Sequence, residues 1–146
     1  MKTDFGLDFG LEALFGFERI FGLTFRILIT GSRDWTDELT VNMAIHDLKE
    51  QYPFQWEDVI IVHGDCPTGA DAIADYFASQ ADLTTERHPS DWNKYGKAAG
   101  PKRNKEMVDL GADIVLAFRK PGSKGTQNCI NYALAAGLPV KIYDAP

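Results

Sequence analysis

The sequence has few of the residues that build disulfide frameworks or metal sites. It contains only two cysteines, Cys66 and Cys129, and three histidines among 146 residues, and no CxxC motif. A disulfide-rich secreted scaffold and a zinc domain are therefore not indicated, and a reducing compartment is the simplest interpretation. We expect neither a metal nor a cofactor.

Long hydrophobic runs are also missing. No apolar stretch approaches the roughly 20 residues that a membrane-spanning helix needs. The first residues do not form a secretory signal, because Asp4 and Asp8 interrupt a stretch whose apolar residues alternate with glycines. We therefore expect a cytoplasmic protein with no membrane partner.

An excess of positive charge is absent as well. The chain has 15 Lys and Arg residues against 21 Asp and Glu residues, a formal net charge of -6. Proteins that bind duplex DNA normally present a basic face, so nucleic acid is not the expected partner. A small anionic ligand held by a local basic cluster remains compatible with this charge.

Residues 1–24 differ from the rest of the chain, because Phe-Gly pairs begin at positions 5, 9, 15 and 21. An exposed aromatic segment of this kind needs a surface to pack on, either on the protein itself or on a neighbouring subunit. We interpret it as an N-terminal extension, an oligomerisation arm or a leader, ahead of one domain that spans residues 25–146. A homo-oligomer is expected on this basis.

From residue 25 onward, strand-like and helical patterns alternate. Short apolar runs typical of buried strands lie at 25–30, 58–63, 83–88, 112–118 and 138–143. Helical patterns lie at 37–51 and 68–80, from Pro101 to Gly111, and before Gly137. This alternation predicts an α/β protein with a three-layer Rossmann-like fold, a mainly parallel five-stranded sheet and helices on both faces.

Four loops rich in glycine or charge follow the predicted strands, at 31–33, 64–71, 88–97 and 119–126. The carboxyl ends of parallel strands lie along one edge of a sheet, where ligands bind near the switch in strand order. The sequence therefore predicts that these loops converge on one binding site.

The first loop reads "TGSRDW". Its Gly-Ser turn lets backbone N–H groups approach an anion, and Arg33 can pair with a phosphate through two hydrogen bonds. The alternative is an ordinary tight turn with a solvated arginine.

The second loop, "HGDCPTGADAIADYFA", has Thr68 and Asp71 at the spacing of a helix capping box. In the functional interpretation, the helix N-terminus faces a ligand phosphate or ribose. The loop is neither a Walker loop nor a GxGxxG motif, since it lacks their glycine and lysine spacing.

Residues 87–105 form a local basic cluster that could steer an anion. Within it, Trp92 offers a surface on which a nucleotide base could stack, as does Trp35 earlier in the chain. The alternative is that the aromatic residues close the core and the charges form a solvated helix face. His63 and His88 match no metal-ligand spacing and are expected to be structural, and both cysteines are expected to be small buried residues.

The segments "ILITGSRDW", "IVHGDCPTGADAIADYFA", "HPSDWNKYGKAAGPKRNKEMVDLGADIVLAF" and "GSKGTQNCINYALAAGLPV" resemble the YspA-like branch of the SLOG superfamily. That superfamily is a Rossmann-like group that also contains the Smf/DprA proteins and the Lonely Guy phosphoribohydrolases. The resemblance covers roughly residues 25–143 and implies a nucleotide or nucleotide-derived ligand. The ligand-binding residues that it implies, together with the loop readings above, are Gly31, Ser32, Arg33, Gly64, Asp65, Thr68, Gly69, Asp71, Arg103, Asn104, Gly122, Ser123, Gly125 and Thr126.

One loop departs from the hydrolytic members, which read Pro-Gly-Gly-x-Gly-Thr-x-x-Glu. Here Ser123 replaces the second glycine and Cys129 replaces the glutamate. A carboxylate stabilises the oxocarbenium-like state of glycosidic cleavage, so the phosphoribohydrolase mechanism does not transfer.

We therefore favour a protein that binds a nucleotide as a sensor or sequestering module over an enzyme. The alternative is a hydrolase that cleaves an N-glycosidic or phosphate bond with Asp65, Asp71 or Asp91 in place of the missing glutamate. A DprA-like single-strand DNA binder is a third hypothesis, and the acidic charge counts against it.

Overall fold

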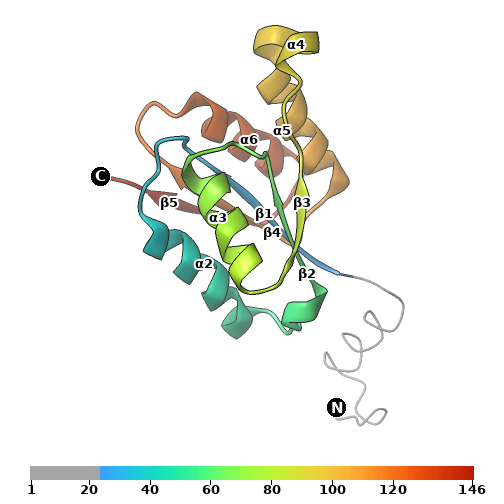
Figure 1. The fold of residues 1–146 in the computed structure, drawn as a ribbon. Helices are drawn as coiled ribbons and strands as arrows, with labels where there is room; N and C mark the ends of the chain where they lie inside the picture. The colour runs from blue at the N-terminus through green and yellow to red at the C-terminus, as the bar shows by residue number, and fades with distance from the viewer. Residues whose placement is uncertain (1–23) are drawn as a thin grey trace.

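The computed structural model describes residues 24–146 of the chain (Figure 1). Apart from Thr24, the expected N-terminal extension lies outside the described residues, so its role as an arm or leader and the homo-oligomer stay predictions. Within residues 24–146, no helix has both the length and the apolar character that crossing a membrane requires.

Five parallel strands form a single sheet in the order β3-β2-β1-β4-β5. Their bounds are β1 (Phe25–Gly31), β2 (Val59–His63), β3 (Thr84–Arg87), β4 (Ile114–Arg119) and β5 (Val140–Asp144). The chain proceeds outward from β1 through β2 to β3 and then crosses back to the other side of β1. The strand order therefore switches between β1 and β4, and the predicted parallel sheet is confirmed.

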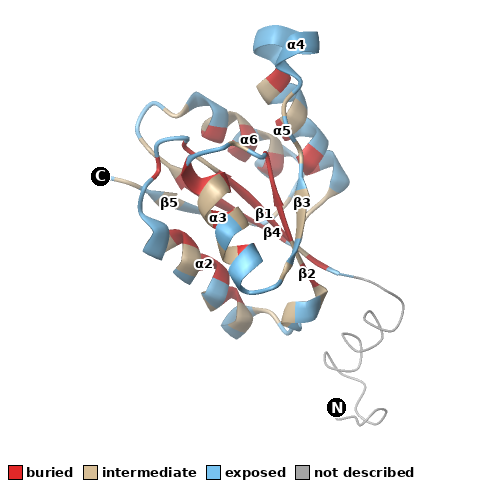
Figure 2. Ribbon diagram, viewed as in Figure 1, coloured by how far each residue is buried: buried red, intermediate tan, exposed pale blue. Residues whose placement is uncertain are grey.

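Helices cover both faces of the sheet, as predicted (Figure 1). α2 (Glu38–Gln51) and α3 (Gly69–Gln80) pack on one face, and α5 (Ala99–Leu110) and α6 (Lys124–Ala135) pack on the other. In β1, Ile27 and Ile29 face the first pair of helices while Leu28 faces the second. Because successive strand side chains point to opposite faces, a strand buried on both sides reads as a continuous apolar run. Figure 2 shows this burial in the central strands.

Three short elements complete the fold: η1 (Trp56–Asp58), α4 (Trp92–Tyr95) and η2 (Gly96–Ala98). α4 projects from the body of the molecule ahead of α5 (Figure 1) and was not predicted from the sequence. The Asp91 side chain accepts a hydrogen bond from Lys94 N at 3.0 Å, and Gly96, with a φ of 54°, ends the helix. A single helical turn has too little periodicity to be recognised in a sequence.

An ion-pair network joins the central strand β1 to the edge strand β3. Arg26 donates to both carboxylate oxygens of Glu86, at 2.8 and 2.9 Å, and His88 Nε2 lies 2.7 Å from the same carboxylate. The hydrogen bond from Arg26 is the main reason that the pKa of Glu86 falls to about 2. The folded state therefore favours the ionised form of this carboxyl group.

We expect Glu86→Gln to lower the free energy of unfolding at pH 7 by on the order of 1 kcal/mol. The folded-state pKa of Glu86 lies below its ordinary value of 4.5, so this stabilisation is complete above that value and is lost as the pH falls toward 2. Urea denaturation of the wild type and the variant between pH 7 and pH 2.5 should show a stability difference that shrinks with acidity. Asp109→Asn, which breaks only the exposed pair with Lys105, is the control, and a pH-independent difference for Glu86→Gln would contradict the prediction.

Candidate functional site

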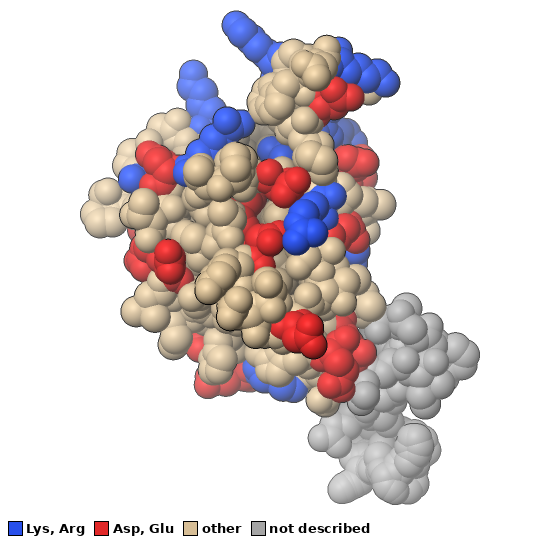
Figure 3. Space-filling model, viewed as in Figure 1, with Lys and Arg blue, Asp and Glu red and all other residues tan. Residues whose placement is uncertain are grey.

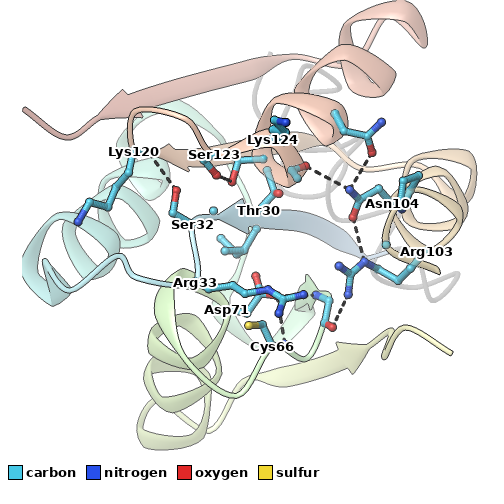
Figure 4. A pocket seen from close by; sticks show the side chains of 18 of the residues that line it. Thr30, Ser32, Arg33, Cys66, Asp71, Arg103, Asn104, Lys120, Ser123 and Lys124 are labelled. Atoms are coloured by element: carbon cyan, nitrogen blue, oxygen red, sulfur yellow. Dashed lines mark hydrogen bonds between the residues drawn. The ribbon is translucent and has the colours of Figure 1, made fainter. Parts of the chain in front are cut away.

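A cleft of about 580 Å³ lies at the carboxyl ends of β1 and β4. The loops after β1, β2 and β4 line it, together with residues of α3, α4, α5 and α6. Figure 4 shows ten of the lining residues with labels, among them Asp71, Arg103 and Lys124. The cleft lies at the point where the strand order switches, which is the usual ligand position in an open α/β sheet. The volume falls in the range of small-molecule and cofactor sites.

The loop after β1 forms the floor of the cleft and is held from several sides. A Cβ at Gly31 would lie 2.4 Å from the Ala70 Cβ and 2.9 Å from the Phe118 carbonyl oxygen, so α3 and β4 approach this strand end closely only because residue 31 is glycine. Ser32 N donates to the Phe118 oxygen at 2.9 Å, and Ser32 Oγ accepts from Lys120 N at 2.9 Å. The Ser32 hydroxyl therefore joins the loops after β1 and β4.

The first two residues of α3, Gly69 and Ala70, pack against the same loop and do not line the cleft. Gly69 has a φ of 75°, and a Cβ there would lie 2.2 Å from the Ser32 carbonyl oxygen. Ala70 N donates to that oxygen at 3.3 Å, and Thr68 Oγ1 donates to the Arg33 oxygen at 2.8 Å. Thr68 and Gly69, both predicted ligand contacts, are absent from the lining of the cleft.

The predicted capping box is wrong, because no side chain caps α3. Asp71 turns away from the helix end, and its Oδ2 accepts hydrogen bonds from Gly64 N at 3.2 Å and Cys66 N at 3.3 Å. The side chain lines the cleft although the residue is only 7% exposed, and this burial raises the pKa of the Asp71 carboxyl group.

Arg103 lies on α5 and holds two loops at the edge of the cleft. Its Nη1 donates to the carbonyl oxygens of Gly64 and His88, which follow β2 and β3. The guanidinium group lies directly against Gly64, where a Cβ would come within 2.2 Å of Nη1. Arg103 lines the cleft, so it positions these loops at the same time as it contributes a positive charge.

The N-terminus of α6 opens into the cleft. Ser123, Lys124, Gly125 and Thr126 line it, no side chain caps the helix, and its first turn has no acidic residue. Asn104 Nδ2 on α5 holds this end in place by donating to the Gly125 oxygen at 3.2 Å. Free backbone N–H groups and the positive end of the helix dipole make such an end a favourable site for a phosphate or another anion.

Positive side chains outnumber negative ones around the cleft, although the whole chain is acidic. Figure 3 shows Lys and Arg side chains gathered at the upper end of the molecule. Lys120 and Lys124 also line the cleft but were not predicted as ligand-binding residues. Their positions on either side of Gly122, in a loop predicted to bind phosphate, could have indicated them. Four cationic residues line the cleft, Arg33, Arg103, Lys120 and Lys124, and two acidic residues do, Asp34 and Asp71.

The two predicted base-stacking residues have different environments. Trp92 lines the cleft, is 49% exposed and has the Arg33 guanidinium carbon 5.6 Å from its ring centroid. Trp35 is 4% exposed and packs edge-on against Phe118 with ring centroids 5.6 Å apart. Trp35 offers no ring face to a ligand, so the prediction that it stacks on a base is wrong. Base stacking on Trp92 stays a prediction.

Asp65 lies outside the cleft, although it was a candidate for both binding and catalysis. It is exposed, has a φ of 58°, and its N donates to His63 Nδ1 at 2.9 Å. The buried His63 ring also lies 2.7 Å from Asp75 through Nε2, which confirms a structural role. Among residues 24–146, no three His, Cys, Asp or Glu side chains gather in a way that could hold a metal ion.

The two cysteines also differ from each other. Cys129 is fully buried on α6, as predicted, and burial raises the pKa of its thiol to about 11. This thiol is therefore protonated, and uncharged, at neutral pH. Cys66 is partly exposed and lines the cleft, so the expectation of a small buried residue is wrong there.

The amino-acid sequence of the chain is similar to known proteins. The family model of the YspA, cpYpsA-related SLOG family matches residues 25–95, which run from β1 to α4. The chain is also similar to the Gene 61 protein of Mycobacterium phage D29, with 44% identity over 120 residues that cover 79% of this chain and 93% of that protein. No solved structure matches. The chain therefore belongs to the YspA, cpYpsA-related SLOG family.

Proposed function

We propose that the cleft binds a nucleotide or a nucleotide-derived molecule, and that the protein acts as a nucleotide sensor or sequestering module. The observation that carries this proposal is the uncapped N-terminus of α6, which opens into a cationic cleft at the strand-order switch. Membership of the SLOG family is consistent with a nucleotide-related ligand.

The lining residues suggest how such a ligand would lie. A phosphate at the first turn of α6 would accept hydrogen bonds from backbone N–H groups and pair with Lys124 and Lys120. Arg33 is exposed at the rim and has no ion-pair partner among the described residues, so its guanidinium group is available to a second phosphate. The exposed ring of Trp92 would then stack on the base.

Binding without cleavage is supported by the buried, protonated thiol at position 129. The hydrolase hypothesis retains one supporting observation: Asp71 lines the cleft with a raised pKa, which suits a proton donor. Asp65 loses its support, because its side chain does not line the cleft.

The first test measures binding and turnover together. The protein is incubated with AMP, ADP-ribose, NAD or cyclic AMP, its thermal midpoint is recorded, and the small molecules are recovered for mass spectrometry. We expect at least one nucleotide to raise the midpoint and to be recovered intact. Recovery of a cleaved product that disappears in Asp71→Asn would support the hydrolase, and an unchanged midpoint with every compound would contradict nucleotide binding.

The phosphate position predicts the effect of Lys124→Gln. Removing this cation from the first turn of α6 should weaken the binding of the stabilising nucleotide about three- to tenfold, measured by isothermal titration calorimetry. Lys141→Gln is the matched control, since Lys141 lies on β5 and does not line the cleft. Equal affinities for the two variants would place the phosphate elsewhere.

If the base stacks on Trp92, removing this side chain should weaken the binding only of ligands that carry a base. Trp92→Ala should weaken nucleotide binding by roughly fivefold or more and leave the affinity for inorganic pyrophosphate unchanged, because pyrophosphate has no ring to stack. Tyr95→Ala is the control: Tyr95 is also exposed on α4 but does not line the cleft. A parallel loss of pyrophosphate affinity in Trp92→Ala would indicate a general defect of the cleft.

A further inference from the structure

The Asp71 carboxyl group has one oxygen fixed by the protein and one oxygen left for something else. Oδ2 accepts the backbone hydrogen bonds from Gly64 and Cys66, which set the orientation of the side chain. Among the described residues, no hydrogen bond and no ion pair reaches Oδ1, although the residue is 93% buried. Because the side chain lines the cleft, the free oxygen is available to a molecule bound there.

A buried acceptor of this kind needs a donor once a ligand displaces water from the cleft. Leaving it unpaired would cost the desolvation energy of a charged oxygen, and burial is already the largest influence on this group. The four cations around the cleft favour an anionic ligand. The donor on such a ligand is therefore expected to be a neutral group, a hydroxyl or an N–H, and not an ammonium group.

The position of Asp71 relative to the expected phosphate favours a sugar hydroxyl over an N–H group as the donor. Figure 4 shows its carboxyl group on one side of β1 and Ser123 and Lys124 on the other. Adjacent strands lie about 4.8 Å apart, so a phosphate on the β4 side and an acceptor on the β2 side are separated by roughly two strand spacings. A ribose that carries its phosphate at the 5′ position covers this span with its 2′- and 3′-hydroxyls, while the base remains at Trp92 at the mouth of the cleft.

We propose that Asp71 Oδ1 accepts a hydrogen bond from a ribose hydroxyl, so that the cleft selects nucleotides with an intact ribose over their 2′,3′-dideoxy forms. This inference rests on the proposed nucleotide-binding function and adds the sugar to it. The two backbone hydrogen bonds to Oδ2 hold the acceptor in place before the ligand arrives, so little entropy is lost in orienting it.

The experiment measures how removing the sugar hydroxyls changes nucleotide affinity, first in the wild type and then in variants of Asp71 and Asp65. Isothermal titration calorimetry is run with AMP, GMP, CMP and UMP and with the 2′-deoxy and 2′,3′-dideoxy form of each. The proteins are the wild type, Asp71→Asn and Asp65→Asn. In Asp71→Asn, the amide oxygen can keep the bonds to Gly64 and Cys66, which turns the amide N–H₂ toward the cleft and replaces an acceptor by a donor.

Asp65→Asn is the matched control because it removes the same charge from the loop that precedes α3 without touching the cleft. Asparagine tolerates the positive φ of residue 65. Urea denaturation of both variants establishes that they fold, and the comparison of ribose with deoxyribose on the wild type needs no variant at all.

For the wild type, we expect the best ribonucleotide to bind about ten- to a hundredfold more tightly than its dideoxy form, as for a hydrogen bond to a charged group. The ratio should fall several-fold in Asp71→Asn, where the hydroxyl can still accept from the amide N–H₂ but no longer donates to a carboxylate, and it should persist in Asp65→Asn. Equal binding of ribose and dideoxyribose forms to the wild type would overturn the inference and leave nucleotide binding intact. An undiminished ratio in Asp71→Asn would also overturn it, and no binding of any nucleotide would overturn the proposed function and the inference together.

Discussion

Ser32 is the residue through which the parts of the cleft are joined. Its N donates to Phe118 on β4, its Oγ accepts from Lys120 N in the loop after β4, and its carbonyl oxygen accepts from Ala70 N on α3. These bonds require close backbone approach, which the glycines at 31 and 69 permit. Hydrogen bonds to Ser32 therefore hold the loop after β4 and the start of α3 to the loop after β1.

The architecture was predictable because its signals are local and periodic. Strand-sized apolar runs alternate with helical spacing, and the end of β1 and the start of α3 are marked by glycines that the structure requires. The convergence of the strand-end loops followed from parallel topology alone. The family resemblance added the expectation of a nucleotide, and the match to the SLOG family confirmed the resemblance.

The individual side chains of the site were predicted less well, because their orientation depends on contacts distant in sequence. Thr68 and Asp71 have capping-box spacing, yet Thr68 bonds to Arg33 and Asp71 to the loop after β2. Trp35 follows the Gly-Ser turn but packs into the core, and no local pattern distinguishes it from the exposed Trp92. Spacing along a helix identifies a candidate pair; only tertiary packing decides what each member contacts.

The contact between Arg103 and Gly64 makes two positions 39 residues apart in the chain depend on each other. A side chain at position 64 would displace the guanidinium group of Arg103 from its hydrogen bonds to the Gly64 and His88 carbonyl oxygens. The effects of changes at the two positions are then strongly non-additive. In the evolution of this cleft, or in its redesign, a side chain at position 64 would therefore release the loops after β2 and β3 from Arg103.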